Sequence, residues 1–386
     1  MSKVYKLTEV VDFIGGSQPP KSKFSYNKKE NYIRLIQIRD YKTDNHIVYI
    51  PKNSTKKFCT DDDIMIGRYG PPVFQILRGL NGAYNVALMK AKPKIDFLSK
   101  EYLFRFLQNP SIQNYIIGLS QRSAGQSGVN KVALEEYEIL VPPLKEQKRI
   151  VAKLDNLFGK IDQAITLHQQ NIDEVEGVMG SALSEVFGEL EENYEKKKLK
   201  TIVKIIGGGT PSKKEPSYWD NGDIKWATVK DMNVETIVNT ELSITKVGLK
   251  NSSSNIIPKN GIIIATRVGL GKVCYLNEDT AINQDLKGIL PLNEDLDIRF
   301  LYNYFKNISR YIINNGTGAT VKGVKLDFIQ SIEISLPPLK VQQKTVTYLN
   351  NISEKTETIK RIQKEKMQSL KELKASILDR AFRGEL

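Results

Sequence analysis

Two glycine-rich segments place polar and basic side chains at the same spacing. In each segment a lysine lies six residues after the first glycine, with hydroxyl or amide side chains between them. Glycine lets a backbone approach a ligand closely, while backbone N–H groups and lysine side chains bind phosphate. A sharp turn between two strands explains the glycines equally well, and both interpretations stay open. The segments contain Gly15, Gly16, Ser17, Gln18 and Lys21 in the first half of the chain, and Gly207, Gly208, Gly209, Thr210 and Lys213 in the second half.

Two further clusters in each half carry hydrogen-bond donors that suit the base edges of a DNA groove. An arginine follows an apolar run in both halves, so we expect it at a strand end, where DNA contact and a structural ion pair are equal alternatives. A polar, glycine-rich loop then precedes the last expected strand. The candidate residues of these two clusters are Arg68, Tyr69, Gly70, Arg122 and Gln126 in the first half, and Arg267, Gly269, Lys322 and Lys325 in the second half.

Neighbouring asparagines and aromatic residues are expected to be structural. We predict that Asn85 and Asn283 fix turns. Aromatic residues interleaved with basic ones belong to cores more often than to stacking platforms. The residues concerned are Tyr26, Tyr41, Tyr69, Tyr218 and Trp219.

No catalytic or metal-binding pattern is recognisable in the sequence. A methyltransferase acting on an exocyclic base nitrogen needs an Asn/Asp-Pro-Pro-aromatic loop, but the Asn-Pro pair at 109–110 is followed by serine. A P-loop needs Gly-x4-Gly-Lys-Ser/Thr, and the segment 269–273 lacks the hydroxyl. The aspartates at 61–63 have no acidic partner pattern, which favours a solvated turn. We therefore expect no catalytic residue, no metal and no cofactor in this chain.

Composition and charge favour a cytosolic protein with a polyanionic partner. The chain has 386 residues, a net charge of +13 and a pI near 9.3. Its length suggests two or three domains, and neither a membrane-spanning run nor a secretory signal is apparent. Two cysteines lie too far apart in sequence for a disulfide framework or a zinc pattern.

Short segments recur in the same order at an offset of about 195 residues. Val/Leu-Pro-Pro-Leu-Lys occurs at 141–145 and 336–340, and Gly-Glu-Leu ends both copies. Residues 14–19 match 206–211, and 62–70 match 261–269, so that Arg68 is aligned with Arg267. This period is too long for a solenoid, and it predicts two copies of a globular lobe followed by a helix.

Helical periodicity follows each proline pair. Residues 145–187 carry an apolar stripe that a lone helix must bury, and the second copy repeats it. The net charge is −6 over residues 144–195 and +5 over 339–386, so the two helices are expected to pair with each other. We assign helix–helix packing or partner docking to Leu154, Leu157, Ile161, Ile165, Leu349, Ile352, Ile359 and Leu370.

These patterns predict an α+β protein. Two similar mixed α/β lobes, residues 1–143 (lobe 1) and 196–338 (lobe 2), carry net charges of +8 and +6. Two long antiparallel helices, in residues 144–195 and 339–386, are expected to form a coiled-coil stalk with the lobes at opposite ends. Such a two-fold arrangement suits a bipartite DNA target.

The repeated segments resemble, over essentially the whole chain, the specificity subunits of type I restriction–modification enzymes. The resemblance lies in the Pro-Pro-Leu-Lys-x-Gln entrance to each helix, the Ile-Gly-Gly-x-x-Pro opening of each lobe and the closing Ala-Phe-Arg-Gly-Glu-Leu. It implies two target-recognition domains, each for half of an asymmetric site, and helical regions that set the spacing. It also implies docking of probably two methyltransferase subunits that use S-adenosylmethionine, with restriction subunits that use ATP and Mg²⁺ as possible additions.

Two other classes of function remain open from the residues alone. One is a stand-alone DNA nuclease with an unrecognised site, and the other is a coiled-coil adaptor that binds RNA or DNA. Ser17-Gln18 stands where the second lobe has Gly209-Thr210, which fits lobes that bind different sequences.

Overall fold

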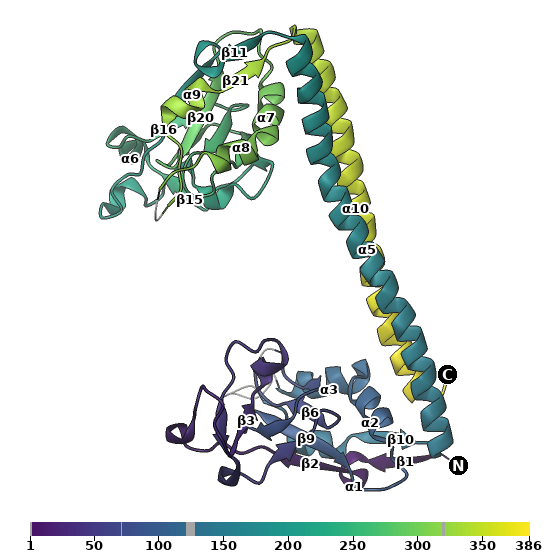
Figure 1. The fold of residues 1–386 in the computed structure, drawn as a ribbon. Coiled ribbons are helices and arrows are strands. Elements are labelled where there is room, and N and C mark those ends of the chain that lie inside the picture. Colours follow the sequence, from purple (N-terminus) through teal and green to yellow (C-terminus); the bar gives the residue numbers. More distant parts are fainter. Residues whose placement is uncertain (1, 71, 121–127, 319–320) are drawn as a thin grey trace. The chain divides into compact units, whose positions relative to one another are not determined.

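The computed structural model describes residues 2–70, 72–120, 128–318 and 321–386 (Figure 1). The chain divides into two compact units, Met1–His168 with Lys364–Leu386 (unit 1) and Gln169–Gln363 (unit 2). Each unit contains one lobe and one part of each of two long helices. Within the described residues, no helix has the length and apolar character that a membrane span requires.

Lobe 1 is built from two four-stranded sheets and a short ribbon. The first sheet has the strand order β2-β9-β6-β7, and the second sheet has the order β4-β3-β8-β5. The ribbon pairs β1 (Lys3–Lys6) with β10 (Glu138–Val141). The other strands are β2 Val11–Gly15, β3 Tyr32–Ile36, β4 Tyr49–Pro51, β5 Phe58–Cys59, β6 Ile64–Gly67, β7 Gln75–Leu77, β8 Gly82–Tyr84 and β9 Leu88–Pro93.

Lobe 2 repeats this plan with one additional strand. Its sheets have the orders β12-β20-β17-β18-β14 and β15-β13-β19-β16, and its ribbon pairs β11 (Lys196–Lys198) with β21 (Glu333–Ser335). The repeat predicted from the sequence is therefore a repeat of topology. The remaining strands are β12 Val203–Gly207, β13 Ile224–Ala227, β14 Thr236–Ile237, β15 Leu242–Ile244, β16 Asn255–Ile257, β17 Ile262–Ala265, β18 Val273–Leu276, β19 Thr280–Ile282 and β20 Leu286–Pro291.

The central strand of each lobe is apolar throughout because both of its faces are covered. In β17, Ile262 and Ile264 pack into the core beneath the helices, while Ile263 and Ala265 pack toward the second sheet. Strand β6 alternates in the same way. A continuous run of buried apolar residues is typical of a strand that is covered on both sides.

The strand pairing corrects one part of the sequence alignment. Ile64 is paired with Ala91, and Ile262 with Ile289, so Ile64 corresponds to Ile262 and not to the next residue along the chain. Arg68 therefore corresponds to Thr266, and Tyr69 corresponds to Arg267. The predicted equivalence of Arg68 and Arg267 is wrong, because a shift of one residue along a strand moves a side chain to the opposite face.

Short helices pack against the sheets of each lobe, and side chains cap several of them. Ser99 caps α2, Asn130 caps α4 and Asp297 caps α7, each by accepting a hydrogen bond from a backbone N–H of the first turn. The short helices are α1 Leu7–Val10, α2 Lys100–Leu107, α3 Pro110–Ser120 and α4 Lys131–Glu136 in lobe 1, and α6 Lys246–Lys250, α7 Ile298–Asn307, α8 Ser309–Asn314 and α9 Leu326–Ser331 in lobe 2.

The two long helices are α5 (Leu144–Asn193) and α10 (Leu339–Phe382), and they lie side by side (Figure 1). In unit 1, Asp162 of α5 accepts hydrogen bonds from Lys374 of α10 at 2.7 Å. In unit 2, the Lys360 Nζ lies 3.9 Å from the Glu176 carboxylate. Residues later in α5 contact residues earlier in α10, so the two helices are antiparallel, as predicted. In both contacts an acidic residue of α5 meets a lysine of α10, as the opposite net charges of the two segments predicted.

A phenylalanine near the end of each long helix anchors it to a lobe. The ring of Phe382 lies 5.0 Å from that of Tyr102 and 5.4 Å from that of Phe106 in unit 1. In unit 2 the ring of Phe187 lies 5.3 Å from that of Phe300. Each unit thus buries the beginning of one long helix and the end of the other against its lobe.

A buried glutamine attaches the beginning of each long helix to the lobe that precedes that helix in the chain. The amide of Gln342 donates to the carbonyls of Asp295 and Pro337 at 2.8 Å, and its Oε1 accepts from the Asp297 N–H at 2.8 Å. Gln147 makes the corresponding three bonds to Phe97, Pro142 and Ser99 at 2.7–2.8 Å. Both glutamines are fully buried, and each bonds to three backbone groups where a long helix leaves its lobe.

We predict that Gln342→Leu lowers the free energy of unfolding of lobe 2 by about 2–4 kcal/mol, because it removes three hydrogen bonds between a buried side chain and the backbone. Both tryptophans of the chain, Trp219 and Trp226, lie in lobe 2, so tryptophan fluorescence during denaturant unfolding reports on this lobe. Gln343→Leu is the matched control, since the adjacent Gln343 is exposed. Equal shifts in both variants would contradict the prediction.

Candidate nucleic-acid interface

The second glycine of each glycine-rich segment is required by the protein's own backbone. A Cβ atom on Gly16 would lie 1.9 Å from the Asn85 carbonyl oxygen, and one on Gly208 would lie 2.1 Å from the Asn283 carbonyl oxygen. The Oδ1 of Asn85 accepts from the Ala87 N–H at 3.1 Å, which fixes the turn opposite Gly16. The structure thus favours the turn interpretation for these glycines, and it confirms that Asn85 fixes a turn.

The other residues of the segments fall into two groups. Gly15 and Gly207 have room for a side chain, because the nearest atom is the end of a flexible side chain 3.9 Å away. Gly209 is packed against Ser253, and Ser17 and Thr210 bond to Thr55 and Gln284. The long side chains remain exposed and can contact a ligand: they are Gln18, Lys21 and Lys213.

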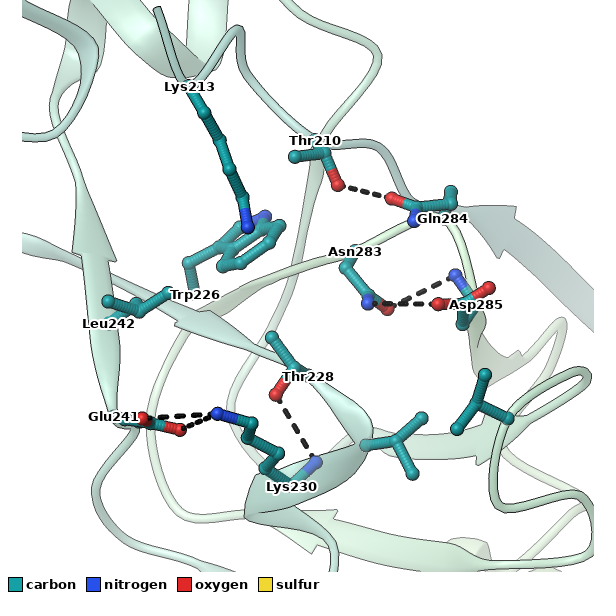
Figure 2. A pocket seen from close by; sticks show the side chains of 12 residues that line it. Thr210, Lys213, Trp226, Thr228, Lys230, Glu241, Leu242, Asn283, Gln284 and Asp285 are labelled. Atoms are coloured by element: carbon teal, nitrogen blue, oxygen red, sulfur yellow. Dashed lines mark hydrogen bonds and ion pairs between the residues drawn. The ribbon is translucent and has the colours of Figure 1, made fainter. Parts of the chain in front are cut away.

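A surface pocket in lobe 2 lies between the glycine-rich segment and a 3₁₀ turn, Val229–Asp231 (Figure 2). The turn begins after β13 and is fixed by the Asp231 carboxylate, which accepts from the Thr228 N–H at 2.7 Å. Lys230 forms an ion pair with Glu241 at 3.2 Å. The polar side chains that line the pocket are Thr210, Lys213, Thr228, Lys230, Glu241, Asn283, Gln284 and Asp285.

Lobe 1 has a pocket in the corresponding place, between its glycine-rich segment and the 3₁₀ turn Ile38–Tyr41. Gln18 and Lys21 line it from the segment, and Gln37 and Arg39 line it from the turn. Gln37, Arg39, Thr228 and Lys230 were not predicted as candidate residues from the sequence. A repeated pattern could have revealed them, because Gln37-Ile-Arg-Asp and Thr228-Val-Lys-Asp both combine a polar, a basic and an acidic residue at the same spacing.

The position of Tyr26 differs from the one predicted for the aromatic residues. We predicted that it belongs to the core, but it is 77% exposed and lines the lobe 1 pocket. The strand pairing explains its exposure, because Ser25 bridges to Tyr49 at the sheet edge and the following residue points away from the core. Trp219 behaves as predicted, since its ring packs against Trp226 with the centroids 5.1 Å apart.

The two arginines at strand ends differ in their partners. Arg267 forms an ion pair with Asp285 at 3.3 Å, which is the structural alternative considered for it. Arg68 donates to the Val86 carbonyl at 3.3 Å and stacks on Tyr69. Since Ala87 corresponds to Asp285, lobe 1 has no carboxylate at that position.

The third cluster is only partly visible. Arg122 and Gln126 lie outside the described residues. In lobe 2, Arg267, Gly269 and Lys322 line one hollow, and the exposed Val268 lines both this hollow and the pocket of Figure 2. Lys325 is exposed at the beginning of α9. The structure therefore brings two of the three predicted clusters of lobe 2 together.

Glycines with positive φ support these loops. The φ angles of Gly70 and Gly269 are both positive, at 92° and 70°. This left-handed conformation favours glycine over other residues. Both glycines follow the arginine-bearing segment, so they turn the chain away from the strand end.

Burial shifts the pKa of one ionisable group beside the candidate loops of each lobe. Burial lowers the pKa of the Lys287 ammonium beside Gly207, and the Asp285 carboxylate opposes this shift. In lobe 1, burial raises the pKa of Asp40, while the Gln37 N–H bond and the Arg34 charge oppose that shift. Asp40 caps the turn that carries Arg39, since its Oδ2 accepts from the Gln37 N–H at 3.1 Å.

The helix residues assigned to packing or docking are mostly engaged within the chain. Leu154, Ile161 and Leu349 are buried in the helix–lobe cores, and Ile359 is 39% exposed. The others are partly buried against the same cores: Leu157, Ile165, Ile352 and Leu370.

A duplicated basic lobe, with paired long helices packed against it, defines a class of modular two-lobed α+β proteins. Comparison with known families identifies the particular family within this class. The model of the type I restriction modification DNA specificity domain matches residues 2–177 and 191–366, and the chain belongs to this family.

Individual relatives agree with this assignment. The MjaIX specificity subunit of a type I restriction enzyme from Methanocaldococcus jannaschii is 32% identical over 179 residues, which cover 45% of this chain and 41% of the relative. The EcoR124I/EcoR124II specificity subunit from Escherichia coli is 31% identical over 44% of this chain and 43% of the relative. The matched part thus spans less than half the length of these two relatives.

Solved structures show the same fold at low sequence identity. A chain from a structural study of complex assembly and conformational transition of the type I R-M system aligns with a TM-score of 0.77 and 21% identity, over 100% of this chain and 98% of that one. The crystal structure of the HsdS subunit from Thermoanaerobacter tengcongensis gives a TM-score of 0.59 with 22% identity, over 100% of this chain and 97% of that one.

We predict that Gly208→Ala destabilises lobe 2 by about 1–3 kcal/mol, because the new methyl group overlaps the Asn283 backbone. Gly207→Ala is the control and should change stability little, since only the end of the Lys287 side chain lies nearby. Tryptophan fluorescence during denaturant unfolding measures both variants. If Gly208→Ala is as well tolerated as Gly207→Ala, the close backbone approach is not a constraint.

Proposed function

We propose that this chain is the DNA-specificity subunit of a type I restriction–modification complex. Each lobe would bind one half of a bipartite, asymmetric DNA site. The observation that carries the proposal is the pair of corresponding surface pockets, each between a glycine-rich segment and a 3₁₀ turn and each lined by basic and polar side chains. Membership of the specificity-domain family supports it.

The differences between the lobes support an asymmetric target. Lys21 and Arg39 line the lobe 1 pocket, while Lys213 and Lys230 share the lobe 2 pocket with Glu241 and Asp285. Base edges are distinguished by their patterns of donors and acceptors. Two pockets with different donors and acceptors are suited to different sequences.

The proposal assigns no catalysis to this chain. Partner methyltransferase subunits, expected to number two, would supply S-adenosylmethionine, and restriction subunits would use ATP and Mg²⁺. The aspartates at 61–63 support this division, because Lys100 contacts Asp62 at 2.7 Å and Lys90 contacts Asp63 at 3.1 Å. The complex would act on DNA in the cytoplasm.

The long helices would dock the partners and set the distance between the two half-sites. Their length is fixed by continuous helical hydrogen bonding over Leu144–Asn193 and Leu339–Phe382. Apolar side chains that stay exposed on them offer contact area to a partner: Leu167, Tyr348 and Ile359.

We predict that replacing residues 1–143 with lobe 1 of another family member changes one half-site and leaves the other unchanged. Genome-wide mapping of methylated bases, with and without the chimera, measures this. The chain alone should transfer no methyl group and cleave no DNA. Metal-dependent cleavage by the chain alone would favour a nuclease, and equal affinity for random duplexes and single-stranded RNA would favour an adaptor.

We predict that inserting four residues between Gln169 and Gln170 of α5 lengthens the helix by about 6 Å and changes the preferred spacing of the half-sites by one or two base pairs. Methylation mapping again gives the spacing. The control is a four-residue insertion after Asn293, in the exposed turn between β20 and α7, which should leave the spacing unchanged. An unchanged spacing after the α5 insertion would contradict the role of the helices.

A further inference from the structure

The two pockets correspond residue by residue, which allows their chemistry to be compared. Gln18 and Lys21 correspond to Thr210 and Lys213, because β2 pairs with β9 in the same register in which β12 pairs with β20. Gln37 corresponds to Thr228, since each precedes a turn that is capped by an aspartate. Arg39 and Lys230 therefore occupy the same position in the two lobes.

Hydrogen bonds and ion pairs within lobe 1 fix the turn that carries Arg39. The Asn85 N–H donates to the Ile36 carbonyl at 3.1 Å, and the Asp40 carboxylate caps the turn. The Arg34 guanidinium lies 3.7 Å from Asp40 and 2.8 Å from Asp44. The Asp40 side chain is fully buried, so the turn is fixed before any ligand arrives.

Arg39 itself remains available to a ligand. Its side chain is 51% exposed, and its Nε lies 4.0 Å from the Asp40 carboxylate. That separation is beyond hydrogen-bond distance. Arg39 lines the hollows on both of its sides, together with the exposed Tyr26. On the side of the glycine-rich segment, none of the described lining residues is acidic.

The corresponding residue of lobe 2 has different surroundings. Lys230 carries one ammonium group instead of a planar fork of donors, and it pairs with Glu241 at 3.2 Å. Asp285 lines the same pocket. Lobe 2 thus presents acceptors beside its cation, whereas the charged groups that line the glycine-segment side of the lobe 1 pocket are donors.

We propose that Arg39 selects a guanine in the half-site bound by lobe 1, by donating two hydrogen bonds to its N7 and O6 in the major groove. This inference rests on the proposed function and names one specificity-determining residue within it. A planar guanidinium matches the two guanine acceptors, and an ammonium group does not provide the same pair of donors. The corresponding position of the other half-site is selected by different groups.

The test is a binding selection from randomised duplexes, with the chain assembled with its methyltransferase subunits. Lobe exchange identifies the half-site that lobe 1 binds. Arg39→Lys keeps the charge and removes the fork, and we expect it to weaken the guanine preference about 10-fold to 100-fold at one position while the salt dependence stays the same. Arg39→Ala should weaken the same preference.

Two control variants separate base selection from general attraction. Lys21→Ala should weaken binding to all duplexes alike and reduce the salt slope by about one, as expected for a phosphate contact. Lys230→Ala should leave the lobe 1 half-site unchanged.

Three outcomes would overturn the inference. An unaltered sequence preference in Arg39→Lys would exclude base selection by the fork while leaving the proposed function intact. Equal weakening of all duplexes by Arg39→Ala would identify a phosphate contact instead. A wild-type complex without any sequence preference would overturn both this inference and the proposed function.

Discussion

The attachment of each long helix to a lobe depends on one buried glutamine. Gln147 and Gln342 each bond to three backbone groups at a place where the chain leaves a strand, passes two prolines and enters a helix. Backbone groups without partners are costly, so this side chain stabilises the junction between the lobe and the helix. The carbonyl of the first proline in each pair accepts a hydrogen bond from the glutamine amide.

In the glycine-rich loops, contacts within the protein fix the backbone, while long side chains remain exposed. Gly16 and Gly208 let the chain cross close to an asparagine turn, and those contacts are satisfied within the protein. The long side chains of Lys21 and Lys213 project from these fixed loops and are exposed. A rigid backbone with variable exposed side chains is the arrangement expected of loops that recognise a ligand.

The sequence predicted the fold well where repetition and periodicity were strong. The duplicated lobes and the paired helices followed from proline pairs, an apolar stripe and opposite charge. The alignment of Arg68 with Arg267 failed because short runs of isoleucine match equally well at neighbouring offsets, and hydrogen bonding alone distinguishes them. The residues of the 3₁₀ turns were missed because Arg39 and Lys230 lie just beyond a predicted strand, and their proximity to the glycine-rich segments arises only in the folded lobe.

The two lobes differ in the length of one interval. The interval from Asp231 to Ile262 in lobe 2 is longer than the corresponding interval from Asp40 to Ile64 in lobe 1. The short helix α6 and the edge strand β14 lie in the longer interval, while the order of the other strands is unaltered. The two lobes thus differ in length at their periphery, where the additional strand lies at a sheet edge, while the order of the other strands is kept.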